Sequence, residues 1–281
     1  MGLNDLTNQF RLFFITNHPE IASFVIKQGV SRIFVDLEYI GKDLRQGHLS
    51  TVKNFHTVED VALVKAACAN DEVMARINPL HAGTQKEVDG CVAAGADILM
   101  LPMYNTASEV LQVADFLAGR AKLCLLAETP SALANMKQIL ELGCVDEVHF
   151  GLNDLCIARS DRFMFQILVQ GELDEAISLL RQHLIPFGIG GLARHGEGLL
   201  PAELLLGEHV RLGSTAAILS RTFHRGALSV QQLMDTMNVR YEINLLQSVY
   251  DYFLRAGQEE LRLNQNEVQR RVESIVKHAG Q

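Results

Sequence analysis

One phrase recurs along this chain: a helical segment, a glycine, a few residues and then a short apolar run. It occurs in KQGVSRIFVDLE, AAGADILMLPM, LAGRAKLCLLAE and ELGCVDEVHFGLND. Each glycine falls where a helix end needs a left-handed residue before the chain returns to a buried strand. The apolar runs that begin at Val73, Ile98, Leu123 and Val148 are 25 residues apart, close to the length of one β-α unit. Such repetition favours a closed barrel of parallel strands.

The apolar runs are continuous rather than alternating, as strands covered on both faces of a parallel sheet require. Helices are predicted between them, including Asp174 to His183 and Pro201 to Gly207. We therefore predict a (β/α)8 TIM barrel over residues 8–225, with a doubly wound sheet as the structural alternative. Its strands are predicted to begin near Leu12, Ile33, Val73, Ile98, Leu123, Val148, Pro186 and Val210. Capping boxes are predicted at Thr57 with Asp60 and at Thr106 with Glu109.

Residues 226–281 remain after the barrel is complete, and they are polar and helical in pattern. The chain is therefore predicted to be a single domain over residues 1–281 with extra C-terminal helices. Leu245, Val249, Tyr252 and Phe253 form an apolar stripe on these helices. The stripe is expected to pack on the outside of the same barrel or on a second copy of the chain, which would make a homo-oligomer.

Composition excludes several classes of partner. The chain of 281 residues has a net charge of −8 and no long basic tract, which argues against nucleic acid and anionic membranes as partners. No apolar run approaches the ~18 residues of a membrane span. The five cysteines are scattered through apolar surroundings without a C-x-x-C pair, which predicts reduced thiols in a cytoplasmic protein.

Two carboxylates stand at corresponding ends of successive predicted strands, Glu128 and Asp154. Parallel neighbours lie ~4.8 Å apart, so the two side chains can converge on one cation. Thr129 and Pro130 already suit the N-cap and first position of the next helix, so a capping role for Glu128 is unnecessary. The other residues at the predicted strand ends of this rim are Asn17, His18, Asn78, Pro102, Tyr104, Gly190, Gly191, Arg194 and Ser214.

Arg76 interrupts the apolar strand VMARINP, where a guanidinium must be nearly buried and needs anions nearby. Asp36 and Glu38 are two residues apart in VDLEY and point the same way from a strand. The arginine could form a structural salt bridge to either acid, or act as an electrophile toward a carboxylate or enolate oxygen. With Glu128 and Asp154, four acids surround one base, which favours a divalent cation. Oxygen ligands without clustered His or Cys indicate Mg²⁺ or Mn²⁺.

Histidines and glycines are less informative. None of His18, His48 and His81 is assigned a catalytic role, and His149, inside a strand, is predicted to be a core residue. The glycine-rich FGIGGLARHGEG and the following LGSTAA stand where barrels often hold phosphate on backbone N–H groups, although such runs also form tight turns.

The motifs VDLEY, ARINP, GADILMLPM, AETPSALANM and FGLNDL occur in an order and spacing that resemble a known family. Over residues 33–219 the chain resembles the metal-dependent HpcH/HpaI aldolase and citrate lyase β-subunit superfamily, whose members are (β/α)8 barrels. The resemblance implies that Glu128 and Asp154 ligate Mg²⁺ or Mn²⁺. It also implies that Arg76 holds the 2-oxo oxygen of a pyruvate-like substrate and stabilises the enolate. Asp36 and Glu38 would order Arg76 and metal-bound water.

The same resemblance implies a place for the substrate and a mode of assembly. The substrate carboxylate would lie on the backbone of Gly151, Leu152, Asn153 and Asp154. Family members tend to form hexamers in which a C-terminal helix packs on a neighbour, so a hexamer or another dimer-based homo-oligomer is expected.

This chain departs from the family pattern at Tyr39, where the sugar-acid aldolases have His and the CoA-thioester lyases have Asp. Proton transfer is therefore open between Tyr39, a rim histidine and metal-bound water. The chain also lacks the proline- and glycine-rich loop of the first subgroup and the late His-Pro element of many members of the second.

The leading hypothesis is a class II type aldolase. Such a carbon–carbon lyase cleaves or forms a bond between a 2-oxo acid and an aldehyde, such as a sugar derivative, through a pyruvate enolate. The alternatives are a CoA-thioester lyase of the citrate or malyl-CoA type and a catalytically silent barrel with a regulatory or scaffold role.

Overall fold

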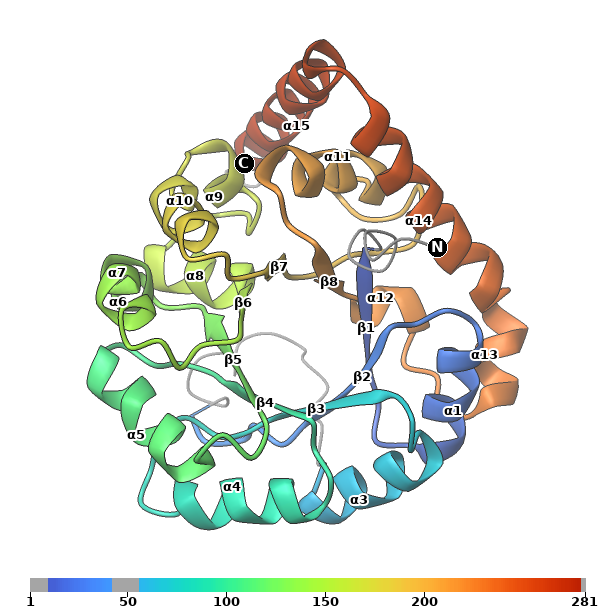
Figure 1. The fold of residues 1–281 in the computed structure, drawn as a ribbon. Helices are drawn as coiled ribbons and strands as arrows, with labels where there is room; N and C mark the ends of the chain where they lie inside the picture. Colours follow the sequence, from blue (N-terminus) through green and yellow to red (C-terminus); the bar gives the residue numbers. More distant parts are fainter. Residues whose placement is uncertain (1–9, 42–55, 279–281) are drawn as a thin grey trace, which may run out of the picture.

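The computed structural model describes residues 10–41 and 56–278, and these contain eight parallel strands in a closed barrel. Each strand pairs with the next along the chain, and β8 pairs with β1 (Figure 1). The closed barrel confirms the predicted fold. The strands are β1 (Arg11–Ile15), β2 (Arg32–Asp36), β3 (Glu72–Arg76), β4 (Ile98–Leu101), β5 (Lys122–Ala127), β6 (Glu147–Phe150), β7 (Phe187–Ile189) and β8 (Ala216–Ile218).

Helices surround the strands and continue past the end of the barrel (Figure 1). Both predicted capping boxes, Thr57 with Asp60 and Thr106 with Glu109, are confirmed. The helices are α1 (Pro19–Lys27), α3 (Val58–Ala67), α4 (Thr84–Ala93), α5 (Ala107–Leu117), α6 (Pro130–Ala134), α7 (Met136–Leu140), α8 (Leu152–Arg159), α9 (Gln166–Val169), α10 (Asp174–Gln182), α11 (Ala202–Leu212), α12 (Arg221–His224), α13 (Val230–Thr236), α14 (Val239–Arg255) and α15 (Gln258–His278).

The predicted start of the eighth strand at Val210 is wrong. Val210 lies in α11, and β8 begins only at Ala216. The segment HVRL resembles a strand because it is apolar, but its side chains are buried in a helix, and a short apolar run fits either structure. Ser214 therefore lies at the amino end of β8 rather than at the carboxyl rim, and its Oγ is 2.8 Å from Nδ1 of the buried His209.

Alternate residues of the strands face the interior of the barrel. Phe13, Phe34 and Met74 belong to one small interior cluster, while strand residues of the other parity pack against the helices. At the amino end, the fully buried Arg32 donates to Glu147 at 2.7 and 2.9 Å and to Glu72 at 2.6 and 3.1 Å. Ion pairs thus close this end, which in such barrels serves stability, and the site is expected at the carboxyl end.

The C-terminal helices α14 and α15 pack on α11 of the same barrel (Figure 1). The buried stripe of α14 consists of Val239, Ile243, Leu246 and Tyr250. The predicted stripe of Leu245, Val249, Tyr252 and Phe253 is therefore not the one that faces the barrel, although Val249 reaches the edge of the core. Tyr252 is 55% exposed. Among the described helices, none combines the length and apolar character that a bilayer crossing needs.

Candidate active site

The strand register brings Arg76 and Asp36 together at the carboxyl end of the barrel. Strands β2 and β3 pair residue by residue until Asp36 lies opposite Arg76. Arg76 donates from Nε to Asp36 Oδ1 at 2.8 Å and from Nη2 to Oδ2 at 2.9 Å. Its Nη1 lies 3.2 Å from Oε2 of Glu38. Both acids are buried, so two carboxylates hold the guanidinium in a fixed orientation.

The loop after β2 is fixed by the buried amide of Asn78. Its Oδ1 accepts hydrogen bonds from the backbone N–H groups of Tyr39 and Ile40, both at 2.9 Å. Its Nδ2 donates to Glu87 at 2.7 Å and to the Leu37 carbonyl at 3.3 Å. The backbone next to Glu38 is thereby held in place. The ring of Tyr39 itself is 67% exposed.

Glu128 directly follows β5 and is buried. Its Oε1 accepts a hydrogen bond from the backbone N–H of Met103 at 3.1 Å. Met103 has a φ of 54°, an uncommon value for a residue with a side chain, and this turn directs the N–H at the carboxylate. Thr129 caps α6 and Pro130 begins it, as predicted, so Glu128 has no part in capping.

Gly151 lies against Glu128. The register of β5 with β6 pairs Ala127 with Phe150, so Glu128 and Gly151 are the next pair. A Cβ atom at Gly151 would lie 2.7 Å from the Cβ of Glu128 and 2.8 Å from its Oε2. Helix α8 begins at the next residue, and Asp154 lies in its first turn. The two predicted metal ligands, Glu128 and Asp154, thus follow adjacent strands.

The acids at this site act on the pKa of Arg76. Burial alone would lower the pKa of Arg76, but the charges of Asp36, Glu38 and Glu128 outweigh burial and raise that pKa above its usual value. Three buried carboxylates therefore act on one guanidinium among the described residues.

The donor set fits a hard divalent cation. Among the described residues no three His, Cys, Asp or Glu side chains form a metal cluster, so the predicted protein ligands are the two carboxylates of Glu128 and Asp154. Mg²⁺ is commonly held by one or two carboxylates, with water and substrate oxygens in its other positions. Two oxygen ligands at the open end of a barrel suit that type of coordination.

Arg194 and the histidines considered for the site lie in different surroundings. His18 and His81 are half-buried near the strand ends, and His48 lies outside the described residues. Arg194 is buried, but it donates to the carbonyls of Phe223 and Thr236 and so joins α12 to α13. His149 is buried in the core, as predicted. Burial lowers its pKa to about 3 and so keeps the imidazole neutral.

Sequence reasoning missed three supporting features. The backbone N–H of Met103 could not be found, because no residue type marks that φ angle. Asn78 was placed at the rim, but its hydrogen bonds to the loop after β2 and to Glu87 depend on tertiary structure. Gly151 was assigned to the substrate, whereas its own N–H donates to the Ala127 carbonyl at 3.1 Å and its lack of a side chain makes room for Glu128.

A family model for HpcH/HpaI aldolase/citrate lyase matches residues 9–160, a segment that contains all five of the residues Asp36, Glu38, Arg76, Glu128 and Asp154. The chain belongs to this family. Members of the family are aldolases and lyases, so membership supports an enzyme. No curated protein sequence matches the chain.

Solved structures of other proteins share the fold. An HpcH/HpaI aldolase from Desulfitobacterium hafniense DCB-2 is 15% identical, with a TM-score of 0.58 over 76% of this chain and 86% of that chain. A family protein from Burkholderia cenocepacia J2315 is 14% identical, with a TM-score of 0.59 over 77% and 89%. RipC from Yersinia pestis is 14% identical, with a TM-score of 0.58 over 91% and 99%. At these identities the likeness concerns the fold alone.

Proposed function

We propose that this protein is a metal-dependent carbon–carbon lyase that cleaves or forms a bond between a 2-oxo acid and an aldehyde through an enolate. The observation that carries the proposal is the half-buried Arg76, held by Asp36 and Glu38 beside Glu128 at the carboxyl end of the barrel. Within this family, a positively charged donor held so rigidly suits an oxygen that gains negative charge during the reaction.

Arg76 can serve the substrate without releasing its two acids. A guanidinium has five N–H groups, and the contacts with Asp36 and Glu38 use one each from Nε, Nη1 and Nη2. One N–H on each terminal nitrogen remains to donate to the 2-oxo oxygen. Donation to that oxygen would be strongest in the enolate, so it would accelerate the reaction rather than only bind the substrate.

Glu128 and Asp154 are the proposed ligands of Mg²⁺ or Mn²⁺. The cation, when bound, would act as a Lewis acid toward the oxygens of the 2-oxo acid. Glu128 also accepts the backbone N–H of Met103 on Oε1, which helps to orient the carboxylate. Leu152 and Asn153 are the first residues of α8. Backbone N–H groups at a helix start lack partners within the helix and bind carboxylates well, so these two are proposed to hold the substrate carboxylate.

In the cleavage direction, a base takes the proton of the hydroxyl group and the carbon–carbon bond breaks to release the aldehyde. The bonding electrons remain on the 2-oxo acid fragment as the enolate, which Arg76 stabilises, and a proton on its terminal carbon then gives pyruvate. Tyr39 and the rim histidines are the candidate proton carriers. The exposed ring of Tyr39 is compatible with a part in binding the aldehyde.

The experiment that tests the proposal is deuterium exchange into the methyl group of pyruvate, followed by proton NMR in D₂O. We expect exchange with Mg²⁺ or Mn²⁺ and none with EDTA. In Arg76→Ala the rate should fall by about 100-fold or more, the scale of losing one donor to a developing oxyanion. Arg120→Ala, which removes an exposed arginine paired with Asp89, is the matched control and should exchange normally.

The outcome separates the alternatives. Exchange that persists in Arg76→Ala would sink the assignment of the enolate site. Absence of exchange with every metal would favour a CoA-thioester lyase or a silent barrel, and calorimetric titration with CoA would distinguish these two, because only the thioester lyase should bind CoA saturably.

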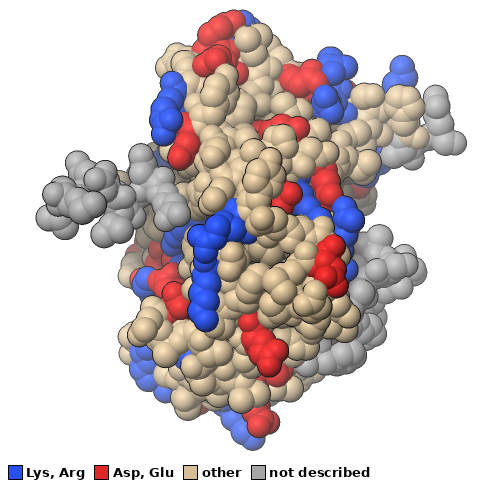
Figure 2. Space-filling model, turned by 90° about the vertical axis from the view of Figure 1, so that its right-hand side faces the viewer, with Lys and Arg blue, Asp and Glu red and all other residues tan. Residues whose placement is uncertain are grey.

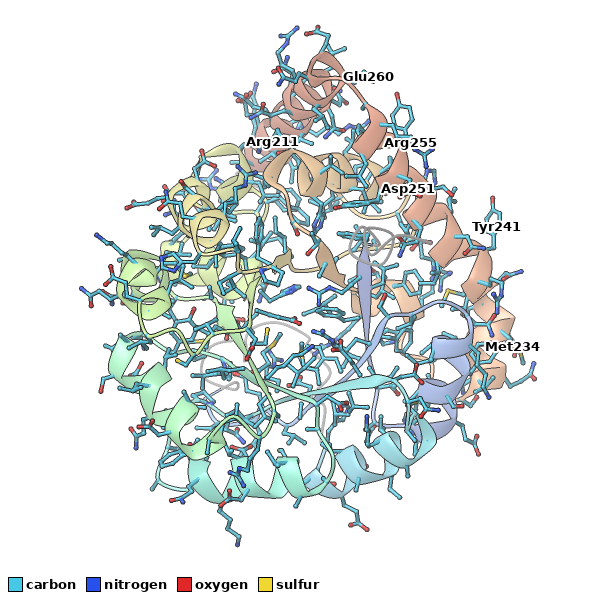
Figure 3. All side chains as sticks on the ribbon, in the orientation of Figure 1. Arg211, Met234, Tyr241, Asp251, Arg255 and Glu260 are labelled. Carbon is cyan, nitrogen blue, oxygen red and sulfur yellow. The ribbon has the colours of Figure 1, made fainter. Side chains whose placement is uncertain are left out.

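We also propose that the protein works as a homo-oligomer, in keeping with the exposed apolar side chains on its C-terminal helices. Met234, Tyr241 and Tyr252 are exposed on α13 and α14. Figure 2 shows this side of the molecule, where charges of both signs surround a broad uncharged area, and Figure 3 labels Met234 and Tyr241 beside α13 and α14. A sedimentation equilibrium experiment would give the subunit number, and a monomer at all concentrations would contradict the proposal.

A further inference from the structure

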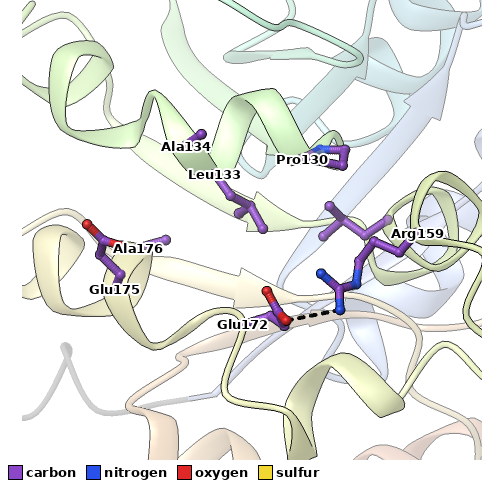
Figure 4. Close-up of a pocket in the computed structure, with 8 residues that line it drawn as sticks. Pro130, Leu133, Ala134, Arg159, Glu172, Glu175 and Ala176 are labelled. Carbon is purple, nitrogen blue, oxygen red and sulfur yellow. Dashed lines mark hydrogen bonds and ion pairs between the residues drawn. The ribbon is translucent and has the colours of Figure 1, made fainter.

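A pocket of about 230 Å³ lies on the outside of the barrel, between α6, α8 and α10 (Figure 4). Its apolar part comes from Pro130, Leu133, Leu155 and Ala176. The pocket is distinct from the barrel mouth that holds Arg76. Its volume is below the ~300–1,000 Å³ that suits drug-sized ligands, so its size matches a small metabolite.

One end of the pocket carries a paired positive and negative group. Arg159 donates from Nε to Asp161 at 2.9 Å and from Nη2 to Glu172 Oε1 and to Gln170, both at 3.0 Å. Among the described residues, no acceptor contacts its Nη1 and no donor contacts Oε2 of Glu172. Figure 4 shows the two side chains next to each other at the pocket. A donor and an acceptor are thus presented side by side.

The charges select the class of ligand. Arg159 contributes one positive charge, and Glu172 and Glu175 contribute two negative charges to the lining, so a simple anion would be repelled. A ligand with a carboxylate for Nη1 and an ammonium group for Glu172 satisfies both groups. An aliphatic side chain on such a ligand would cover Pro130, Leu133 and Ala134, the apolar lining residues that are exposed or half-buried.

We propose that this pocket binds a free α-amino acid with an apolar side chain. Its carboxylate lies on Arg159, its ammonium group on Glu172 and its side chain between α6 and α10. The pocket is linked to the proposed metal ligands through the chain, because Pro130 is two residues from Glu128 and Leu155 directly follows Asp154. The amino acid is therefore expected to change the affinity for the metal, and this second part rests on the proposed function.

Calorimetric titration of the full chain with L-leucine, L-valine and L-methionine tests the binding site. We expect saturable binding of at least one of them. Isocaproate, which lacks the ammonium group, and isoamylamine, which lacks the carboxylate, should each bind about tenfold or more weakly than leucine, because each leaves one charged group unmatched. The absence of binding by all three amino acids would overturn the proposal.

Two variants locate the binding. Ala134→Trp adds bulk at an exposed position of the lining and should abolish it, and Glu172→Gln should weaken it about tenfold, the usual effect of losing one charged partner. Glu141→Gln, an exposed glutamate outside the pocket, is the matched control. Thermal unfolding checks that the variants are folded. Full leucine binding by folded Ala134→Trp would place the amino acid elsewhere and overturn the site.

The link to the active site has its own readout. Mn²⁺ titrations with and without saturating leucine should give different affinities, and leucine affinity should change by the same factor when Mn²⁺ is present. Equal Mn²⁺ affinities would overturn the link while the pocket stands. Because leucine binding is measured without substrate or metal, failure of the lyase assignment and failure of the pocket are separate results.

Discussion

At the scale of single residues, the proposed metal site depends on the lack of a side chain at Gly151. Gly151 has a φ of −89°, which any residue can adopt, so its backbone does not require glycine. What requires it is the Glu128 side chain, which occupies the space of a Cβ atom at this position. Gly151 therefore acts on the proposed metal site by positioning Glu128.

Gly151→Ala is expected to displace Glu128 and to weaken Mn²⁺ binding by about 10- to 100-fold, the range seen when residues that position metal ligands are altered. Stability should fall by about 1–3 kcal/mol from overpacking. Calorimetric titration with Mn²⁺ and urea unfolding measure the two effects. Gly257→Ala, where a Cβ atom would meet nothing within 4 Å, should leave Mn²⁺ affinity unchanged. Undiminished Mn²⁺ affinity in Gly151→Ala would show that Glu128 is not a ligand.

At the scale of elements, strand parity is what made the site predictable. Asp36 and Arg76 face the same interior because they end neighbouring strands in register, and a period of two is visible in the sequence alone. The prediction of a strand beginning near Val210 was wrong because a short buried helix and a buried strand have the same composition. The bond from Met103 to Glu128 and the pocket on α8 could not be predicted, since both depend on how separate elements approach each other.

The loop after β2 is held by one pair of side chains, Asn78 and Glu87. Burial raises the pKa of Glu87 even though Asn78 donates to it. Asn78→Asp keeps an acceptor for the loop N–H groups but places two carboxylates in contact. We expect a loss of about 2–3 kcal/mol in stability, together with slower pyruvate exchange.

The double variant Asn78→Asp with Glu87→Gln restores a donor opposite the new carboxylate. It should recover most of the stability lost by the single change, and urea unfolding of the three variants measures the coupling between the two positions. If the double variant were as unstable as the sum of both single changes, the pair would not act as the clamp described.

At the scale of the whole molecule, the two ends of the barrel divide stability from chemistry. The amino end holds a closed set of ion pairs around Arg32, whose partner Glu147 keeps a pKa of about 2, because the hydrogen bonds and charges of Arg32 and Arg11 outweigh the effect of burial. At the carboxyl end, Arg76 contacts Asp36 and Glu38 in the proposed site.

Two buried histidines make the largest contribution to the pH dependence of stability, and the half-buried His224, whose pKa burial also lowers, adds to it in the same direction. Burial lowers the pKa of His149 and of His209 to about 3, from 6.5 in the unfolded chain. As the pH falls below 6.5, these histidines bind protons in the unfolded chain but not in the folded protein. The free energy of unfolding therefore falls with acidification. Between about pH 7.5 and about pH 5.5 each histidine should cost about 1.4 kcal/mol. Glu147 adds a further loss only below its unfolded pKa of 4.5.

Urea unfolding at those two pH values measures the loss, which should total about 3 kcal/mol for the pair. His209→Phe removes one titrating group from the core and should lose about half as much over the same interval, whatever its stability at the higher pH. His183→Gln, at an exposed position, should behave like the parent chain. An unchanged pH dependence in His209→Phe would mean that His209 takes up a proton in the folded protein, against the expectation from its burial with Ser214 as its one side-chain hydrogen-bond partner among the described residues.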